Sequence, residues 1–363
     1  MIGTFEPQFG RTRQLVRLAD KAGLSLQIRP YQLWGKDKVQ AARRGLAATA
    51  FKMLSTYVRM SLHALRVGTT PSQRPAAFLV PHPSQIDGVV IGIIGRIVRI
   101  PVVIDYFVSL HETVILDRQL ASTKSMKASI LKVIDRWSAR LSSTVLTDTP
   151  EDAAEFSSIT RTPLHKWRVI RVGADPEIYY RHPEIAQVPH SILFYGTYIP
   201  LQGIEHIVRA SLLLPSHYQL TLLGDGQLRQ QIENLIEECN APIHLVDAVT
   251  ENELVRHISA AEVCLGVFGH GEKMQRVIPN KVYQCLAVGR AVITGDSPAI
   301  KILGDAVVTV PVANPEALAS AIITLIENDE QRRDLEVKGY QLFNDLFTDE
   351  QVLLEFTQVF SGR

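Results

Sequence analysis

The chain has 363 residues, of which 46% are hydrophobic and 21% are charged. This composition excludes a disordered protein, and the length allows two domains of ordinary size. The formal net charge is +1, so the charge balance predicts no nucleic-acid partner.

Cysteine usage and the N-terminus predict a cytoplasmic protein. The three cysteines, Cys239, Cys264 and Cys285, have no CxxC spacing and read as reduced thiols. The first residues, MIGTFEPQFGRTRQ, lack the apolar run of a signal peptide. No stretch reaches the roughly 18 apolar residues that a membrane span needs.

Short apolar runs alternate with helical patterns along the chain, and we expect each run to be a buried parallel strand. In chain order the runs are 76–80, 102–107, 143–148, 167–172, 191–196, 218–224, 243–248, 262–268, 291–294 and 307–310. This alternation predicts an α/β fold of two doubly wound, Rossmann-like domains that face each other across a cleft.

The domain boundaries follow from composition. Residues 173–188 are rich in proline and charge without periodicity, which predicts an interdomain linker. It separates an N-terminal domain, 1–172, from a C-terminal domain, 189–345. We expect the final helix, 346–363, to pack back on the N-terminal domain.

The N-terminal half carries polar residues after its strands. His82 follows the strand 76–80, and the segment after 102–107 contains His111 and Glu112 among other polar side chains. Histidine and glutamate at a strand end suit acid–base work or sugar binding, although either can be an ordinary loop residue. Gly3, near the first strand, is a further candidate because glycine lets a ligand approach the backbone.

A basic helix is predicted over 36–66. Apolar residues recur at intervals of three and four, and Arg44, Lys52, Arg59 and Arg66 lie on the other side. Phe51, Leu54, Val58 and Leu62 widen the apolar surface beyond one stripe. The ordinary interpretation is a core helix with a solvated basic face; the alternative is a helix that lies on an anionic membrane surface.

Glycine turns end two successive strands of the C-terminal half. Gly196-Thr197-Tyr198 follows the strand 191–196, and Gly224 follows the next strand. One such turn is weak as a signal, but two of them would line one crevice.

The stretch VIPNKVYQCLAVG contains the most informative lysine. Asn280 suits a helix N-cap and Gly289 suits the C-terminal stop, so Lys281 would lie in the first helical turn. The helix dipole disfavours a cation there, and a bound anion would explain its position. Gln284 lies one turn further on nearly the same face and could hydrogen-bond a hydroxyl-rich ligand. A solvated surface lysine is the alternative.

The ordered segments FYGTYIPLQGIEHIVRA, LLGDGQLRQQI, VIPNKVYQCLAVGRAVITG and VPVANPEALASAIITLI resemble the donor half of the retaining GT-B glycosyltransferases of family 4. The segment RVGADPEIYY is similar to the family's interdomain segment. This resemblance implies a nucleotide-diphosphate sugar as donor substrate in the C-terminal domain, no metal and no other cofactor. It also implies a carbohydrate or lipid-linked acceptor on the N-terminal domain.

The chain departs from the family at its charged positions. Where the family commonly has an arginine and a lysine that neutralise the diphosphate, this chain has Tyr198 and Gln202. The family's paired glutamates fall on Arg276 and Gln284. We therefore expect the cationic work to be shared by Lys281 and Arg276, with Glu272 as the acidic group nearest to the lost first glutamate.

These expectations describe a retaining hexosyltransferase in cell-surface polysaccharide or glycolipid assembly, cytoplasmic or peripheral at the inner face of the membrane. Two alternatives remain open. A sugar-nucleotide epimerase would form product without an acceptor, and a non-catalytic subunit would bind nucleotide sugar without turnover.

Overall fold

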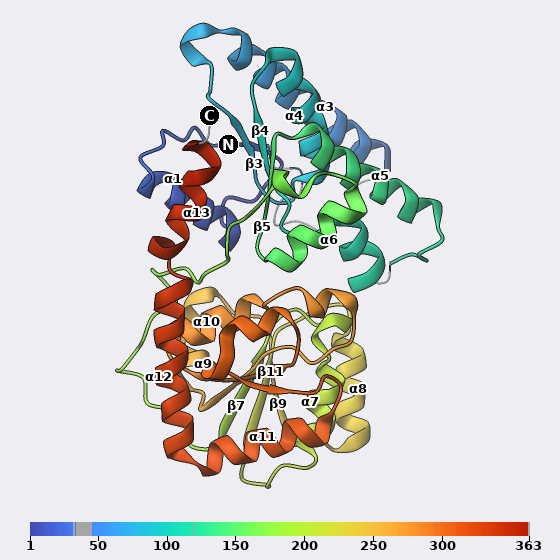
Figure 1. Ribbon diagram of the computed structural model, residues 1–363. Helices are drawn as coiled ribbons and strands as arrows, with labels where there is room; N and C mark the ends of the chain where they lie inside the picture. Colours follow the sequence, from blue (N-terminus) through green and yellow to red (C-terminus); the bar gives the residue numbers. More distant parts are fainter. Residues whose placement is uncertain (32, 34–45, 119, 362–363) are drawn as a thin grey trace. The chain divides into compact units, whose positions relative to one another are not determined.

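The computed structural model describes residues 1–31, 33, 46–118 and 120–361, and it divides into two compact units (Figure 1). Unit 1 comprises Met1–Arg171 together with Leu353–Arg363, and unit 2 comprises Val172–Val352. The predicted linker, 173–188, forms no helix or strand and belongs to unit 2.

Unit 1 contains a four-stranded parallel sheet in the order β3-β4-β5-β6, with a two-stranded parallel sheet, β1-β2, beside it. The strands are β1 (Ile2–Gly3), β2 (Arg29–Pro30), β3 (Phe78–Val80), β4 (Val102–Asp105), β5 (Thr144–Thr147) and β6 (Trp167–Val169). The helices are α1 (Gly10–Lys21), α3 (Leu46–Thr69), α4 (Gln85–Val98), α5 (Met126–Leu141), α6 (Pro150–Thr160) and most of α13 (Asp349–Ser361).

Unit 2 contains a six-stranded parallel sheet in the order β12-β11-β10-β7-β8-β9. Its strands are β7 (Ser191–Tyr195), β8 (Gln219–Leu223), β9 (Ile243–Val246), β10 (Val263–Leu265), β11 (Ala291–Gly295) and β12 (Val308–Val310). Its helices are α7 (Ile204–Ser211), α8 (Arg229–Cys239), α9 (Glu251–Ala260), α10 (Asn280–Val288), α11 (Pro315–Glu327) and α12 (Asp329–Leu346).

Each unit has its own apolar core, because parallel strands between helices bury both faces. In unit 2, Phe194, Leu222 and Leu265 pack with Ile207 of α7 and Ile322 of α11. All ten predicted strands are confirmed, and the α/β prediction with them.

Three local expectations met different outcomes. The N-cap of α10 is Pro279 rather than Asn280, and no side chain caps this helix. Residues 36–45 of the predicted basic helix lie outside the described residues, while the remainder, to residue 66, is part of α3. Arg171 of unit 1 forms an ion pair with Glu355 of α13, which ties the last helix to that unit.

Candidate functional site

The strand order of unit 2 reverses between β7 and β10. Strands to one side follow the chain as β7-β8-β9, and strands to the other side follow it as β10-β11-β12. Open parallel sheets bind ligands beyond the carboxyl ends of their strands at such a reversal. The loops after β7 and β10, and helix α10 after them, therefore define the candidate site.

The two glycine turns lie side by side at this edge, as expected. An added Cβ on Gly224 would lie 2.0 Å from the carbonyl oxygen of Gly196. Gly203 is equally constrained, because its Cβ would lie 2.3 Å from the backbone nitrogen of Gly269 in the loop after β10. Its left-handed φ of 65° marks the start of α7, near which the sequence predicts that a helix begins.

Substituting Gly224 by alanine should destabilise unit 2 by about 3 kcal/mol or more, because the methyl group collides with Gly196 and the φ of 140° is strained for alanine. Gly271→Ala is the matched control: its φ is 142°, but nothing lies within 4 Å of the added Cβ. The control should lose about 1 kcal/mol from strain alone. Thermal denaturation followed by circular dichroism measures both losses, and equal losses would contradict the close approach of the two turns.

Lys281 points from the first turn of α10 toward the turn after β7. Its side chain is 6% exposed, and Nζ donates to Gln202 Oε1 at 2.7 Å. Nζ also lies 3.7 Å from the centre of the Phe194 ring. A Cβ placed on Gly196 would be 3.2 Å from Nζ. The ammonium group therefore sits against bare backbone at the strand-order reversal.

No acidic side chain in the described part of the chain pairs with Lys281. Burial lowers the pKa of this lysine well below its ordinary value, and the nearby Cys285 opposes the shift only partly. An ammonium group has three donor hydrogens, and a buried charge without a counter-ion is costly. An anion beside Gly196 would supply the missing charge and further acceptors.

Arg229 of α8 shows the opposite situation close by. Its guanidinium donates to Gly224 O at 2.7 Å and is paired with Glu233 at 2.5 Å and with Asp247 at 3.3 Å. Carboxylates already balance the charge of Arg229, so this residue supports the glycine turn, whereas Lys281 has no carboxylate partner among the residues that the structure describes.

Tyr195, at the end of β7, holds α10 in place. Its Oη donates to Gln284 Oε1 at 2.9 Å and approaches the carbonyl oxygen of Lys281 at 3.2 Å. Burial raises the pKa of Tyr195 well above its ordinary value, so the phenol stays protonated. Gln284, predicted as a ligand for hydroxyl groups, is half-buried and already accepts this bond through one of its amide atoms.

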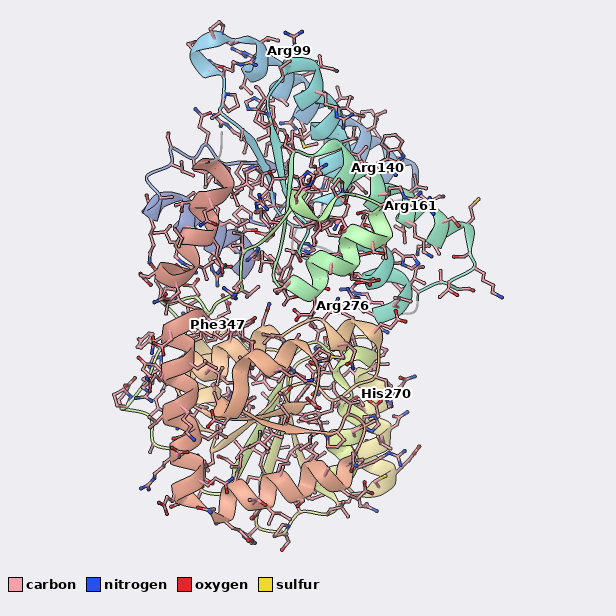
Figure 2. All side chains as sticks on the ribbon, viewed as in Figure 1. Arg99, Arg140, Arg161, His270, Arg276 and Phe347 are labelled. Atoms are coloured by element: carbon pink, nitrogen blue, oxygen red, sulfur yellow. The ribbon has the colours of Figure 1, made fainter. Side chains whose placement is uncertain are left out.

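The remaining donor-side candidates differ in exposure. Tyr198 is fully buried in the apolar core of unit 2, and burial raises its pKa to about 12. It packs there and supplies no charge. Thr197, Glu272 and Asn280 are exposed, and Arg276 is half-buried after a short 3₁₀ turn. Figure 2 shows Arg276 at one end of unit 2. None of these placements tests the predicted roles.

In unit 1 the segment after β4 is held by a buried carboxylate that the sequence analysis did not single out. Asp135 of α5 accepts from Ser109 Oγ at 2.7 Å and from the backbone N–H groups of Leu110 and His111 at 3.0 Å each. Asp135 is 2% exposed, and burial raises its pKa. This capping arrangement orders the turn that carries His111 and Glu112.

His111 keeps an unused ring nitrogen. Burial lowers the pKa of its imidazole, Lys132 adds to that shift, and Asp135 opposes it. Its Nε2 is buried without a hydrogen-bond partner among the residues that the structure describes. A neutral imidazole of this kind can accept a proton or a hydroxyl hydrogen bond. Glu112, its neighbour, is 5% exposed, and its backbone N–H donates to Ser109 Oγ at 3.1 Å.

The turn at Gly3 packs against a buried carboxylate within unit 1. A Cβ on Gly3 would lie 2.7 Å from Asp87 Oδ2, and Asp87 accepts hydrogen bonds from Thr4 Oγ1 at 3.0 Å and Tyr57 Oη at 2.9 Å. Packing within unit 1 therefore explains why position 3 is a glycine. The predicted contact of Gly3 with a donor stays a prediction.

Arg11, placed beyond this loop in the sequence, is a structural residue. Its side chain is 1% exposed and pairs with Asp105 at 3.2 Å, and Nη1 donates to Ile170 O at 2.8 Å. These bonds fix the start of α1 to the end of β4 and to the last residues before unit 2.

Among the described residues, no group of three or more His, Cys, Asp or Glu side chains is arranged to hold a metal ion. No helix in the described ranges is long and apolar enough to cross a membrane. A cavity of about 350 Å³ in unit 1 lies between β2 and α3, lined by Arg29, Tyr31, Thr56 and Arg59 among others, and does not coincide with the predicted residues.

The similarity to a known protein family lies within unit 2. Residues 189–328 match the family model described as "Glycosyl transferases group 1". A search of curated proteins gives no match.

Solved structures resemble most of the chain. The Anabaena protein HepE in complex with UDP is 14% identical, with a TM-score of 0.66 over 86% of this chain and 84% of that one. Sucrose-phosphate synthase from Thermosynechococcus elongatus is 20% identical, with a TM-score of 0.68 over 93% and 82%. A TarM variant of S. aureus, in complex with fondaparinux, α-GlcNAc-glycerol and UDP, is 14% identical, with a TM-score of 0.56 over 72% and 51%.

At these sequence identities, the similar structures establish the fold of this chain. The family model adds a match for residues 189–328. The chain therefore has the GT-B fold of two Rossmann-like domains, and its residues 189–328 are similar to the group 1 glycosyltransferases.

Proposed function

We propose that this protein transfers a hexose from a nucleoside diphosphate sugar to an acceptor, with retention of the anomeric configuration, as a glycosyltransferase of family 4. The observation that carries the proposal is the buried amine of Lys281, which has no carboxylate partner among the described residues and lies against Gly196 at the strand-order reversal. A diphosphate is the anion that such a site in a group 1 glycosyltransferase domain would bind.

The donor diphosphate would lie beside the turns at Gly196 and Gly224. Lys281 would neutralise it, with Arg276 as the second cation. Gln202, which now accepts a hydrogen bond from Lys281, would keep the ammonium group aimed at the turn. Gln284 and Asn280 would bond hydroxyl groups of the donor through their amides.

The chemistry needs no enzyme nucleophile. As the bond between the sugar and the diphosphate breaks, the leaving diphosphate would take the proton of the acceptor hydroxyl, and that oxygen would bond to the anomeric carbon on the same face. The protein would contribute by positioning both substrates and by stabilising charge on the departing phosphate. Lys281 and Arg276 therefore act most strongly in the transition state.

On the acceptor side we propose His111 and Glu112, with Glu272 from unit 2 bonding a sugar hydroxyl. The unused Nε2 of His111 supports its part, because it is a buried acceptor or donor without a partner in the described residues. A carbohydrate or lipid-linked acceptor, in cell-surface polysaccharide or glycolipid assembly, is the setting that we propose.

A thermal-shift panel of UDP-, GDP-, ADP- and dTDP-sugars, with and without magnesium, tests the donor site. We expect UDP-sugars to raise the melting temperature, because HepE was crystallised with UDP and with UDP-glucose. A ligand at about 100 times its Kd stabilises by about 2.7 kcal/mol. A shift without magnesium supports metal-independent binding. No shift with any of the nucleotides would contradict the donor site.

One observation favours a second candidate, a non-catalytic subunit that binds nucleotide sugar. Tyr198 is buried and Gln202 and Gln284 are neutral, so cations and carboxylates that the family uses are absent from those positions. Donor binding without transfer or hydrolysis would support this candidate. A changed sugar without added acceptor would indicate an epimerase, and an NMR assignment of the product's anomeric proton would test retention.

A further inference from the structure

Residues 46–148 of unit 1 present positive charge almost without negative charge. This segment contains twelve lysines and arginines and six acidic residues. The acidic side chains are all at most 7% exposed: Asp87, Asp105, Glu112, Asp117, Asp135 and Asp148. The rest of the chain therefore has a formal charge of −5 against the total of +1.

Internal interactions account for the inward acids. Asp87 accepts hydrogen bonds from Thr4 and Tyr57, Asp105 forms an ion pair with Arg11, and Asp135 caps the turn before His111. As a result, helices α3, α4 and α5 expose basic side chains and no carboxylate. Their basic residues are Lys52, Arg59, Arg66, Arg96, Lys127, Lys132, Arg136 and Arg140.

The same three helices each expose one apolar stripe. Residues of each stripe recur at spacings of three, four or seven, so they share one side of their helix. The stripes are Phe51, Leu54, Val58 and Leu62 on α3; Ile86, Ile93 and Ile97 on α4; and Met126, Ile130, Val133 and Trp137 on α5. Phe51 is 73% exposed and Trp137 is 48% exposed, values unusual for aromatic side chains.

The three helices form one layer. Helix α4 packs against both α3 and α5, and Figure 1 shows them side by side. Glycines permit close packing of α4 and α5: a Cβ on Gly92 would lie 2.6 Å from Leu141 Cβ, and one on Gly88 would lie 3.3 Å from Ser138 Cβ. Arg96 of α4 also donates to the carbonyl oxygen of Arg140 at 3.0 Å. Figure 2 shows Arg99, just after α4, and Arg140, near the end of α5. We call the exposed side of this layer the α3–α5 face.

We propose that the α3–α5 face docks on an anionic lipid bilayer. Apolar and aromatic side chains flanked by lysine and arginine suit the boundary between headgroups and acyl chains, where the cations meet lipid phosphates. The charge is complementary to anionic lipid. The exposed isoleucine, leucine and valine side chains of this face would gain no binding free energy from contact with nucleic acid. This inference is independent of the donor site in unit 2. The proposed membrane contact involves a layer of three helices, whereas the sequence alone offered one basic helix.

Vesicle flotation with the full-length protein tests the proposal. We expect the wild type to cofloat with phosphatidylcholine vesicles that contain about one third phosphatidylglycerol, less at high salt, and not with phosphatidylcholine alone. Two double variants should each reduce the bound fraction about tenfold: Phe51→Ser with Trp137→Ser removes apolar anchors, and Lys127→Glu with Arg140→Glu reverses two charges. All four side chains are exposed, so circular dichroism should show unchanged folding.

The matched controls lie on α12 of unit 2. Val337 is 55% exposed, and the Arg333 side chain is 75% exposed. Val337→Ser and Arg333→Glu should therefore bind vesicles like the wild type. Wild-type protein that does not cofloat, or cofloating that both double variants retain, would overturn the proposal. So would a dimer in solution that the Phe51→Ser, Trp137→Ser variant dissociates, because the face would then be covered by a second copy.

Discussion

Replacing Lys281 by methionine should raise the melting temperature of the unliganded protein and lower kcat/KM for transfer at least about tenfold. The two effects have one cause. The buried ammonium group has one hydrogen bond and a contact with the Phe194 ring, but no counter-ion in the described part of the chain, so its desolvation is incompletely offset. Methionine fills similar space without charge, and we expect a gain of about 1–3 kcal/mol. Thermal denaturation with and without donor, together with steady-state kinetics, measures both effects.

Lys301→Met is the matched control, because Lys301 is an exposed lysine of the same unit and should change neither quantity. Unchanged kcat/KM in the Lys281 variant would remove this lysine from the donor site. A lower melting temperature would show that its charge stabilises the fold, as an ordinary structural lysine would.

Proton linkage gives the Lys281 prediction a second readout. Because burial lowers the folded-state pKa of Lys281, the unfolded chain binds more protons between that pKa and the ordinary value, and stability rises with pH across this window. A bound diphosphate favours the charged lysine and raises its pKa again. Donor binding should therefore take up a proton in this window, and titration calorimetry in buffers of different ionisation enthalpy would detect the uptake. The Lys281→Met variant should show none.

Breaking the Arg11–Asp105 pair should destabilise unit 1 by about 3–5 kcal/mol, because the remaining partner is left buried and unpaired. Asp105→Ala should have the larger effect, since arginine cannot lose its proton at any accessible pH. In Arg11→Met, the lone Asp105 can become neutral. Its pKa in the folded state then lies above the unfolded value, so the penalty is present above the folded pKa and is relieved as pH falls through it.

Tryptophan fluorescence during urea denaturation measures these losses in unit 1 alone, because the three tryptophans, Trp34, Trp137 and Trp167, all precede residue 172. The double variant Arg11→Met, Asp105→Leu should recover much of the loss, since it leaves no buried charge. If a fall in pH reduces the loss of stability as much in Asp105→Ala as in Arg11→Met, the expected difference between a lone Arg11 and a lone Asp105 is wrong.

Local patterns in the sequence were sufficient for the ten strands β3 to β12 and for the place of Lys281 in the first turn of α10. Each of these ten strands lies in an apolar run, and such a run is a property of neighbouring positions. Lys281 was identifiable because a cation in the first turn of a helix conflicts with the helix dipole, which is also a local effect. The structure adds that this lysine is buried and that no carboxylate of the described residues pairs with it, which depends on β7 lying beside β10.

Side-chain direction was beyond the sequence. Tyr198 falls at a position where the family has a phosphate-binding side chain, yet its ring packs into the core of unit 2, and its backbone is hydrogen-bonded to Asp225 and Leu228. Asp135 looks like an ordinary helix residue until the fold brings the turn before His111 to it. The widened apolar surface of α3 was visible in the sequence, but only the fold shows that Met60 and Ala64 are buried while Phe51 and Leu62 face outward.

The division of the chain has a consequence for how the protein is made. Unit 1 begins at Met1 but includes Leu353–Arg363, so all of unit 2 is translated before the first unit is complete. A nascent chain that has reached residue 352 contains every strand of the sheet in unit 2, whereas Arg171 still lacks its partner Glu355, 184 positions further along the chain. Domains generally fold as units during synthesis. The unit that is started first is therefore the last to mature, and a ribosome that stops short of α13 would release a protein with a finished C-terminal sheet and an unfinished N-terminal unit.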